Sequence, residues 1–343
     1  MLNLTGDPAV MQYCFPQLKG SCPRSQTMVL IKVAIYIFLA FIILMTVCGN
    51  LLVIISISHF RQLHSPTNLL ILSLAFTDWF LGVSVMPYSM IRSVENCWYF
   101  GELFCKIHSS FDIVMSTASV LHLGLISVDR YLAICKPLQY RTSVTIHKVA
   151  VLIGITWLLS IAFGFGVVFS KVNVVGVEEL FINPCTGTCI VFFNKQEGLL
   201  GAFLGFFIPY TVMMALYIKI FYIAKVQAKM INCSLQMTGA KRDKKNSTSE
   251  QREKKAAKTL GIVLGVFLLC WLPFDMVLIV DPFFNTSPVI FDALVWLAYF
   301  NSSCNPLIYG YFYPWFRRVF KIIITGNILK NGSSLLNIYA ENK

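Results

Sequence analysis

Residues 28–57 read MVLIKVAIYIFLAFIILMTVCGNLLVIISI, the apolar run that decides the fold. A helix needs about 20 such residues to cross the hydrocarbon core of a bilayer. The run is too long for the apolar region of a cleavable signal peptide, and residues 1–27 before it are largely polar. We therefore expect a first membrane span over residues 28–57 and no cleaved leader.

The composition of the whole chain indicates many further spans. Of its 343 residues, 57% are hydrophobic and 13% are charged, and the mean hydropathy is +0.69. Soluble globular domains contain about 45–50% apolar and about 25% charged residues. The composition therefore excludes a soluble enzyme, a disordered chain and a collagen-like chain, and it predicts a polytopic membrane protein.

Seven apolar runs are long enough to span a bilayer as helices. They cover residues 28–57, 67–92, 103–134, 148–170, 197–224, 256–281 and 288–311. The net charge is +12, and eleven Lys and Arg residues lie between Lys219 and Lys258, around the gap between the fifth and sixth runs. Such a basic loop stays in the cytoplasm, and an odd number of spans then places the N-terminus outside. Because membrane topology explains the charge, contact with nucleic acid is not expected.

The predicted fold is an all-helical membrane protein, a seven-transmembrane-helix bundle with a short cytoplasmic amphipathic helix. We expect an extracellular N-terminus over residues 1–27, the seven-span domain over 28–311, and the amphipathic helix with the cytoplasmic tail over 312–343. The amphipathic helix is predicted from the mixture of aromatic and basic residues after the last span. Asn3 begins a glycosylation sequon on the extracellular side.

Asp112 is the acidic residue within the spans that most directly indicates a ligand. Arg130 closes the same span 18 residues later, about 27 Å further along a helix, so Asp112 lies near the outer face. A buried carboxylate needs a cationic partner, and no Lys or Arg lies at a matching depth. A protonated amine from outside is the natural partner, and a structural pair or a protonated acid is the alternative.

A second polar group is expected at mid-membrane around Asp78 in the second span. Further oxygen atoms from three other spans come from Asn50, Ser119, Asn301 and Asn305. A group of oxygen atoms suits a hard cation such as sodium. The alternative is a water-filled polar hub, and the two can coexist.

A third polar group lies at the cytoplasmic end of the spans. The third span ends in Asp129-Arg130-Tyr131, and Glu253 lies near the inner end of the sixth. An Arg130–Glu253 ion pair would hold the two spans together and could break on activation. Separate interfacial charges are the alternative, because solvent-exposed pairs contribute little.

Six of the eleven cysteines fall outside the membrane under this topology, where disulfides persist. They are Cys14, Cys22, Cys97, Cys105, Cys185 and Cys189. Their positions alone leave the pairing open.

A set of short motifs follows in order along the spans. The motifs are Gly49-Asn50, Leu74-Ala75 with Asp78, Asp129-Arg130-Tyr131, Trp157, Pro209 with Tyr217, Cys270-Trp271-Leu272-Pro273 and Asn305-Pro306-Leu307-Ile308-Tyr309. Together they resemble the rhodopsin-like G-protein-coupled receptors over almost the whole chain. Further blocks are residues 55–68, Ile91-Arg92-Ser93-Val94-Glu95 with Cys97-Trp98-Tyr99-Phe100-Gly101, Trp296 with Tyr299, and residues 311–316. In these blocks the chain is similar to the trace amine-associated receptors.

The resemblance implies a ligand site between the spans and no cofactor other than a possible allosteric sodium ion. Its expected residues are Asp112, Ser116, Trp271, Phe274, Trp296 and Tyr299. Asp112 is the expected counter-ion of the amine, and Trp271 is a packing switch. The aromatic rings would attract the ammonium group by about 0.5–2 kcal/mol.

The resemblance also implies an activation site and two disulfides. The expected activation and coupling residues are Asp129, Arg130, Tyr131, Tyr217, Glu253 and Tyr309. The implied disulfides are Cys105–Cys189, between the third span and the second outer loop, and Cys22–Cys185, which holds the N-terminus over the pocket. Cys14 and Cys97 stay unassigned.

Asp275 departs from the pattern of the family, because an aromatic or apolar residue is expected after Phe274. It lies two residues after Pro273, at roughly the depth of Asp112. We expect a second cation site there, so that the ligand is a diamine or polyamine bridging the two carboxylates. The alternative is a biogenic monoamine receptor in which Asp275 is protonated and structural.

The function implied is that of a plasma-membrane receptor for amines, of chemosensory (olfactory) type. It would activate a stimulatory or olfactory G protein and raise cyclic AMP. An enzyme is not expected, because the five histidines are scattered and show no metal-binding spacing. A transporter is a remote alternative, since no inverted repeat relates the halves of the chain.

Overall fold

The structure is a computed structural model that describes residues 12–170, 185–189, 201, 203–238, 261–280, 286–312, 314–330, 332–336 and 338. Within these residues the ordered elements are helical, apart from two isolated β-bridges, Tyr13 with Pro23 and Ser21 with Thr186. The predicted all-helical fold is confirmed. The expectations for Asn3 and Glu253 lie outside the described residues.

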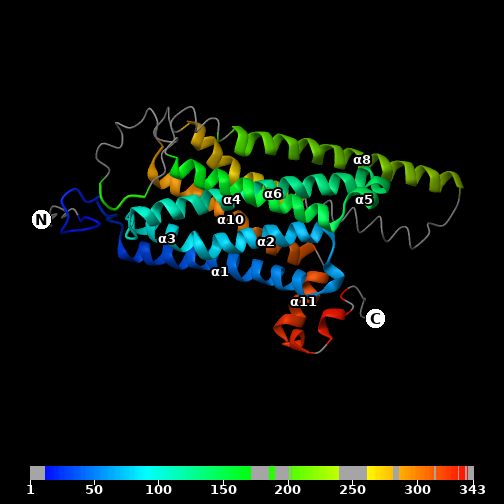
Figure 1. Ribbon diagram of the computed structural model, residues 1–343, viewed down its shortest axis with the longest axis horizontal. Coiled ribbons are helices and arrows are strands. Elements are labelled where there is room, and N and C mark those ends of the chain that lie inside the picture. Colours follow the sequence, from blue (N-terminus) through cyan, green and yellow to red (C-terminus); the bar gives the residue numbers. More distant parts are fainter. Residues whose placement is uncertain are drawn as a thin grey trace, which may run out of the picture.

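The helices of the bundle run along the long axis of the molecule (Figure 1). They are α1 (Val29–His59), α2 (Pro66–Ser84), α3 (Met86–Glu95), α4 (Glu102–Cys135), α6 (Ile146–Phe169), α8 (Ile208–Thr238), the helix Gly261–Val280 and α10 (Pro288–Phe312). The shorter elements are η1 (Arg61–Leu63), α5 (Pro137–Ser143), the π-helical turn η4 (Phe203–Phe207), α11 (Pro314–Ile324), η5 (Asn327–Leu329) and η6 (Ser333–Leu335). α4 packs against α2, α6 and α8, and α1 packs against α2 and α10.

The surface of the bundle is apolar enough to contact the hydrocarbon core of a membrane. Five of the described helices are long and apolar enough to cross a membrane: Val29–His59, Pro66–Ser84, Glu102–Cys135, Ile146–Phe169 and Gly261–Val280. α8 adds an apolar helix over Ile208–Ile223, and α10 buries polar side chains in the bundle, among them Asn301 and Asn305. Large apolar side chains face outward, such as Leu158 and Leu269, which are 69% and 74% exposed. Exposed apolar surface of this extent marks contact with a membrane.

The second expected span, residues 67–92, is divided in the structure into α2 and α3. The break falls at Val85 because Pro87, in the first turn of α3, has no N–H to continue the hydrogen-bond ladder of α2. α3 then extends to Glu95 and ends at Asn96, whose left-handed backbone (φ 54°) is a common helix-ending conformation. The expected span over residues 67–92 is therefore made of two consecutive helices.

α11 is the amphipathic helix expected after the last span, and it lies beside the end of α1 (Figure 1). Its Trp315 and Val319 are buried, whereas Phe320 and Ile324 are exposed. Arg317 donates to two carbonyl oxygens at the end of α10, at 3.1 and 2.6 Å. These bonds satisfy acceptors that the end of a helix leaves open.

Gly164 allows α6 to approach α4 closely. A Cβ added there would lie 2.5 Å from Val114 Cγ2 and 2.8 Å from the Ser110 carbonyl oxygen. Gly164→Ala is therefore expected to lower the free energy of unfolding by about 1–3 kcal/mol, because overpacking forces the two helices apart. The measurement is the melting temperature of the protein in detergent.

Gly166, on the same helix, is the matched control for Gly164. A Cβ there meets nothing within 4 Å. Gly166→Ala should be neutral or stabilising, because alanine favours a helix over glycine by about 1 kcal/mol. An equal loss of melting temperature in both variants would contradict the close-packing explanation.

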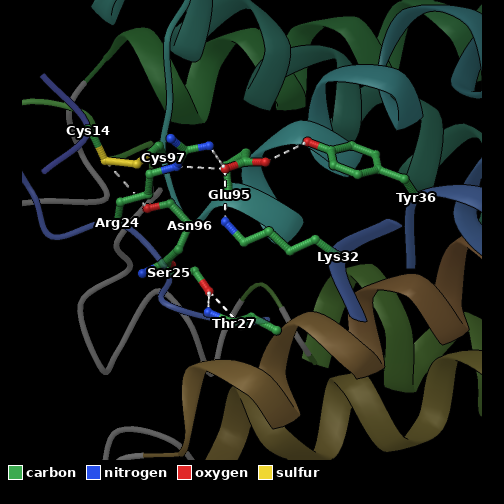
Figure 2. A network of polar contacts seen from close by, with 9 residues as sticks. All are labelled: Cys14, Arg24, Ser25, Thr27, Lys32, Tyr36, Glu95, Asn96 and Cys97. Carbon is green, nitrogen blue, oxygen red and sulfur yellow. Dashed lines mark hydrogen bonds and ion pairs between the residues drawn. A yellow bond between two sulfur atoms is a disulfide. The ribbon is translucent and has the colours of Figure 1, made fainter. Parts of the chain in front are cut away.

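Three disulfides among the described residues lie at one end of the bundle, called here the disulfide-bonded end, and two of them tie the N-terminal residues to it. They are Cys14–Cys97, Cys22–Cys185 and Cys105–Cys189. The last two are the pairs that the family resemblance implied. The first joins the two cysteines that the sequence left unassigned, and Figure 2 shows it beside the end of α3.

Glu95, at the end of α3, is the centre of the polar network in Figure 2. Its Oε2 accepts hydrogen bonds from Arg24 Nε (2.8 Å) and Lys32 Nζ (3.0 Å), and its Oε1 accepts from the Tyr36 hydroxyl (3.2 Å). Burial opposes the charge on Glu95, but the bonds from Arg24 and Lys32 outweigh burial and hold the pKa of the carboxyl below 4.5. Glu95 thus joins the N-terminal segment, α1 and α3.

The stabilisation from Glu95 is expected to disappear in acid. A carboxyl group whose pKa is lowered by folding contributes fully above its unfolded pKa of 4.5, and the contribution is lost as the pH falls through the folded pKa. At neutral pH the melting temperature of the wild type should therefore exceed that of Glu95→Gln, and the difference should shrink below pH 4.5. If the difference in melting temperature between the two proteins does not change with pH, the stabilisation by Glu95 does not depend on its charge.

Candidate functional site

Asp112 lies half-buried on α4 with one carboxylate oxygen already bonded. The Tyr299 hydroxyl of α10 donates to Oδ2 at 2.7 Å. Among the described residues, no hydrogen bond or ion pair reaches Oδ1. Ser116, half-buried one turn further along α4, lies on the same helix face. Because a carboxylate in an apolar interior is stable as an anion only beside a positive charge, Asp112 is suited to hold a cation at Oδ1.

Aromatic rings from α10 and the helix Gly261–Val280 form a connected group that includes Tyr299, the partner of Asp112. Trp296 and Tyr299 meet edge to face with centroids 5.5 Å apart, and Phe274 contacts Trp271 at 6.2 Å. Phe274 also packs against the cluster that contains Trp296 and Tyr299. The structure thus brings the four expected aromatic residues together, and their ring faces attract a cation.

Asp275 follows Phe274 and is 6% exposed. Its Oδ2 is buried and has no hydrogen-bond partner in the part of the chain that the structure describes. An ionised carboxylate cannot remain there alone, so the side chain either holds a proton or meets a second positive charge on a ligand. Both alternatives derived from the sequence are compatible with this burial.

Asp78 of α2 is the centre of a buried polar cluster. Its Oδ1 accepts from the Ser302 hydroxyl at 2.7 Å, and its Oδ2 accepts from the Asn305 amide at 2.8 Å. Ser119 Oγ and Asn301 Oδ1 are buried oxygen atoms without a hydrogen-bond partner among the described residues. The described residues also contain no group of three or more His, Cys, Asp or Glu side chains for a metal. Hydroxyl and amide oxygens around one carboxylate fit a hard cation or ordered water.

Asp129 and Arg130 form an ion pair at the end of α4, with Arg130 Nε 2.9 Å from Asp129 Oδ2. The Thr67 and Tyr140 hydroxyls donate to the same carboxylate at 2.7 and 2.9 Å. Arg130 also donates to the Thr67 hydroxyl. Because Glu253 lies outside the described residues, the Arg130–Glu253 pair stays a prediction.

The three remaining activation residues lie in one hydrophobic core cluster. Tyr217 and Tyr309 are buried members of the cluster, and Tyr131 packs against it. The cluster therefore connects α4, α8 and α10.

Sequence reasoning missed Ser302, Thr67 and Tyr140. Ser302 lies three residues before Asn305, on the same helix face, and this spacing was a usable signal. Thr67 and Tyr140 reach Asp129 from separate elements, 62 and 11 residues away in sequence. No local pattern marks either of them.

Residues 49–309 match the family model of the seven-transmembrane receptors of the rhodopsin family. The chain is 48% identical to trace amine-associated receptor 4 of Mus musculus over 332 residues, which cover 96% of each chain. It is 45% identical to trace amine-associated receptor 1 of Homo sapiens over 336 residues, 97% of this chain and 99% of the relative. It is 49% identical to trace amine-associated receptor 2 of Homo sapiens over 314 residues, 91% and 87% of the two chains.

Proposed function

Because this chain belongs to the rhodopsin family of seven-transmembrane receptors, and within it to the trace amine-associated receptors, we propose that it binds a protonated amine at Asp112 and activates a G protein. It is a multi-pass membrane receptor and not an enzyme. One observation carries the amine site. The half-buried Asp112 carboxylate has Oδ2 bonded by Tyr299, a member of the aromatic cluster, and has no ion pair among the described residues.

In this proposal the receptor lies in the plasma membrane with residues 1–27 outside, the spans over 28–311, and residues 312–343 inside. The disulfide-bonded end supports this orientation, because disulfides persist outside the cell and are rare in the cytosol. The basic residues between the fifth and sixth spans support it independently. Asn3 is the proposed glycosylation site, and α11 rests on cytoplasmic lipid.

The ligand proposed is a diamine or polyamine of the kind that a chemosensory receptor detects. One ammonium group binds Asp112 and the second binds Asp275, whose buried Oδ2 has no other partner among the described residues. The carbon chain of the ligand, between its two ammonium groups, is enclosed by Trp271, Phe274 and Trp296. The second candidate is a monoamine receptor in which Asp275 is protonated, and the same burial supports it.

Activation is proposed as a population shift. The bound amine favours the state in which the outer ends of spans five to seven close around Trp271, and Pro209 and Pro273 allow their helices to bend. Span six then moves away from Arg130, which is bonded here to Asp129, and the opened cytoplasmic side admits a stimulatory or olfactory G protein. The other proposed coupling residues are Tyr131, Tyr217, Glu253 and Tyr309. The expected output is a rise in cyclic AMP.

A sodium ion beside Asp78 is proposed as an allosteric ligand, held by Asp78, Ser119, Asn301 and Asn305. The buried Ser119 and Asn301 oxygens without a hydrogen-bond partner among the described residues support the site. Sodium chloride, compared with potassium chloride, is expected to raise the melting temperature of the wild-type receptor. The rise should vanish in Asp78→Asn, because the amide removes the charge that attracts the ion. An equal rise in both proteins would exclude Asp78 as the sodium ligand.

The test of the proposed function is cyclic AMP in cells expressing the receptor. The panel consists of phenylethylamine, trimethylamine and straight-chain diamines of increasing length. A preference that peaks at one diamine length supports two anchors a fixed distance apart. A preference for a monoamine supports the second candidate, and silence to the whole panel overturns the amine assignment or the coupling to cyclic AMP.

A further inference from the structure

A line of hydrogen-bonded side chains leads from Asp112 to a buried histidine. Tyr299 Oη lies 2.7 Å from Asp112 Oδ2, Ser89 Oγ lies 3.4 Å from Tyr299 Oη, and His108 Nε2 lies 3.2 Å from Ser89 Oγ. The members come from three helices, α3, α4 and α10. His108 and Asp112 lie one turn apart on the same face of α4.

The chemistry of the end groups sets the direction of every bond in this line. A carboxylate only accepts hydrogen bonds, so the Tyr299 hydroxyl donates to Asp112. The Tyr299 oxygen then accepts from the Ser89 hydroxyl, and Ser89 accepts from His108 Nε2. The Val85 carbonyl oxygen, 3.2 Å from the same Nε2, also only accepts. Both neighbours of Nε2 therefore place the imidazole proton on this nitrogen, and all donors point toward the carboxylate.

The line is enclosed in the interior. His108, Ser89 and Tyr299 are buried, and His108 Nδ1 has no hydrogen-bond partner among the described residues. The Trp98 ring lies 5.1 Å from the His108 ring, and the Trp98 backbone N–H donates to the Gly187 carbonyl oxygen at 2.7 Å. Hydrogen bonds shielded from water are stronger and polarise one another along a line. The line thus connects the disulfide-bonded end with the ligand carboxylate.

We infer that His108 is a positioning residue for the amine counter-ion: acting through Ser89 and Tyr299, it holds Asp112 Oδ2 and leaves Oδ1 for the ammonium group. This inference rests on the proposed function, in which Asp112 binds the amine. It adds a residue that lies outside the expected ligand site and acts through two others.

The test is a double-mutant cycle between His108 and Tyr299. His108→Leu and Tyr299→Phe are each expected to raise the half-maximal amine concentration about tenfold, because each cuts a buried line that ends on a charged group. In the Tyr299→Phe background, His108→Leu should add less than about twofold, since the line is already cut. His108→Gln should restore potency to within about threefold, because its amide N–H can donate to Ser89. The probes are phenylethylamine and the diamine series, read as cyclic AMP at matched surface expression.

His122 provides a matched control on the same helix. It is as buried as His108, but its nitrogens contact the Ala118 carbonyl oxygen (2.6 Å) and the Ser73 hydroxyl (2.7 Å), which do not lead to Asp112. His122→Leu and Tyr299→Phe should therefore have additive effects on potency. If His108→Leu fails to reach the surface, Ser89→Ala cuts the same line with a smaller change and takes its place in the cycle.

The outcomes separate the two proposals. Additive effects of His108 or Ser89 with Tyr299, or wild-type potency of His108→Leu, overturn the positioning role. If Asp112→Asn keeps wild-type potency, or the wild type is silent to every probe, the proposed function fails and the inference fails with it. If Asp112→Asn loses the response and the effects of His108→Leu and Tyr299→Phe are additive, the positioning role of His108 is overturned while amine binding at Asp112 stands.

Discussion

Asp112→Asn is expected to abolish the response to every amine in the panel. Asparagine keeps the shape of the side chain and can still accept a hydrogen bond from Tyr299, so the variant removes mainly the charge. Removing one partner of a buried, hydrogen-bonded charge pair costs about 2–5 kcal/mol, which corresponds to at least about a 30-fold loss of potency. The measurement is the cyclic AMP concentration–response curve at matched surface expression.

Glu102→Gln is the matched control for Asp112→Asn. Glu102 lies on the same helix, its side chain is 84% exposed, and it pairs with Lys106 at 2.7 Å. Surface pairs contribute little, so potency should change by less than about twofold. A comparable loss of potency in both variants would show that the ligand responds to the overall negative charge of the receptor and not to a specific counter-ion.

Asp275→Asn is expected to separate diamines from monoamines. If the second ammonium group of a diamine meets Asp275, the variant should lower diamine potency by at least about 30-fold, the smallest loss expected for one buried charge pair. Phenylethylamine carries one ammonium group and should change by less than about threefold. The preferred diamine length should also disappear, because one of the two anchors has lost its charge.

Equal shifts for monoamines and diamines would contradict a second cation site. That result would make Asp275 a protonated structural residue and would favour the monoamine candidate. Unchanged diamine potency in Asp275→Asn together with its loss in Asp112→Asn would lead to the same conclusion.

The sequence predicted most of the helices because membrane spans are read from local composition. α1 and α4 begin and end within two residues of the spans expected over 28–57 and 103–134. The break between α2 and α3 was missed, because Pro87 is compatible with a kinked span as well as with two helices. α8 continues to Thr238, beyond the predicted end at residue 224, because polar residues outside the hydrocarbon remain good helix formers.

The candidate site was predicted only in part. Asp112 and Asp78 stand out because an ionisable residue in a span is costly and therefore conspicuous. Ser89 carries no such signal, since a serine in a helix is more often a packed residue, and the sequence alone leaves His108 open between core packing and tuning of the ligand site. Their significance depends on a contact across 210 residues of sequence, between Ser89 and Tyr299.

The sequence by itself determined that the chain is a bundle of membrane helices with acidic residues, Asp78, Asp112 and Asp275, within its spans. These properties follow from length, hydropathy and the cost of burying charge, which are local to each segment. Only the tertiary structure decided that Cys14 pairs with Cys97, that Glu95 joins α1 to the N-terminal segment, and that His108 lies at the end of the line to Asp112. Such contacts depend on how each helix is rotated about its axis and which neighbour it meets, and no single segment carries that information.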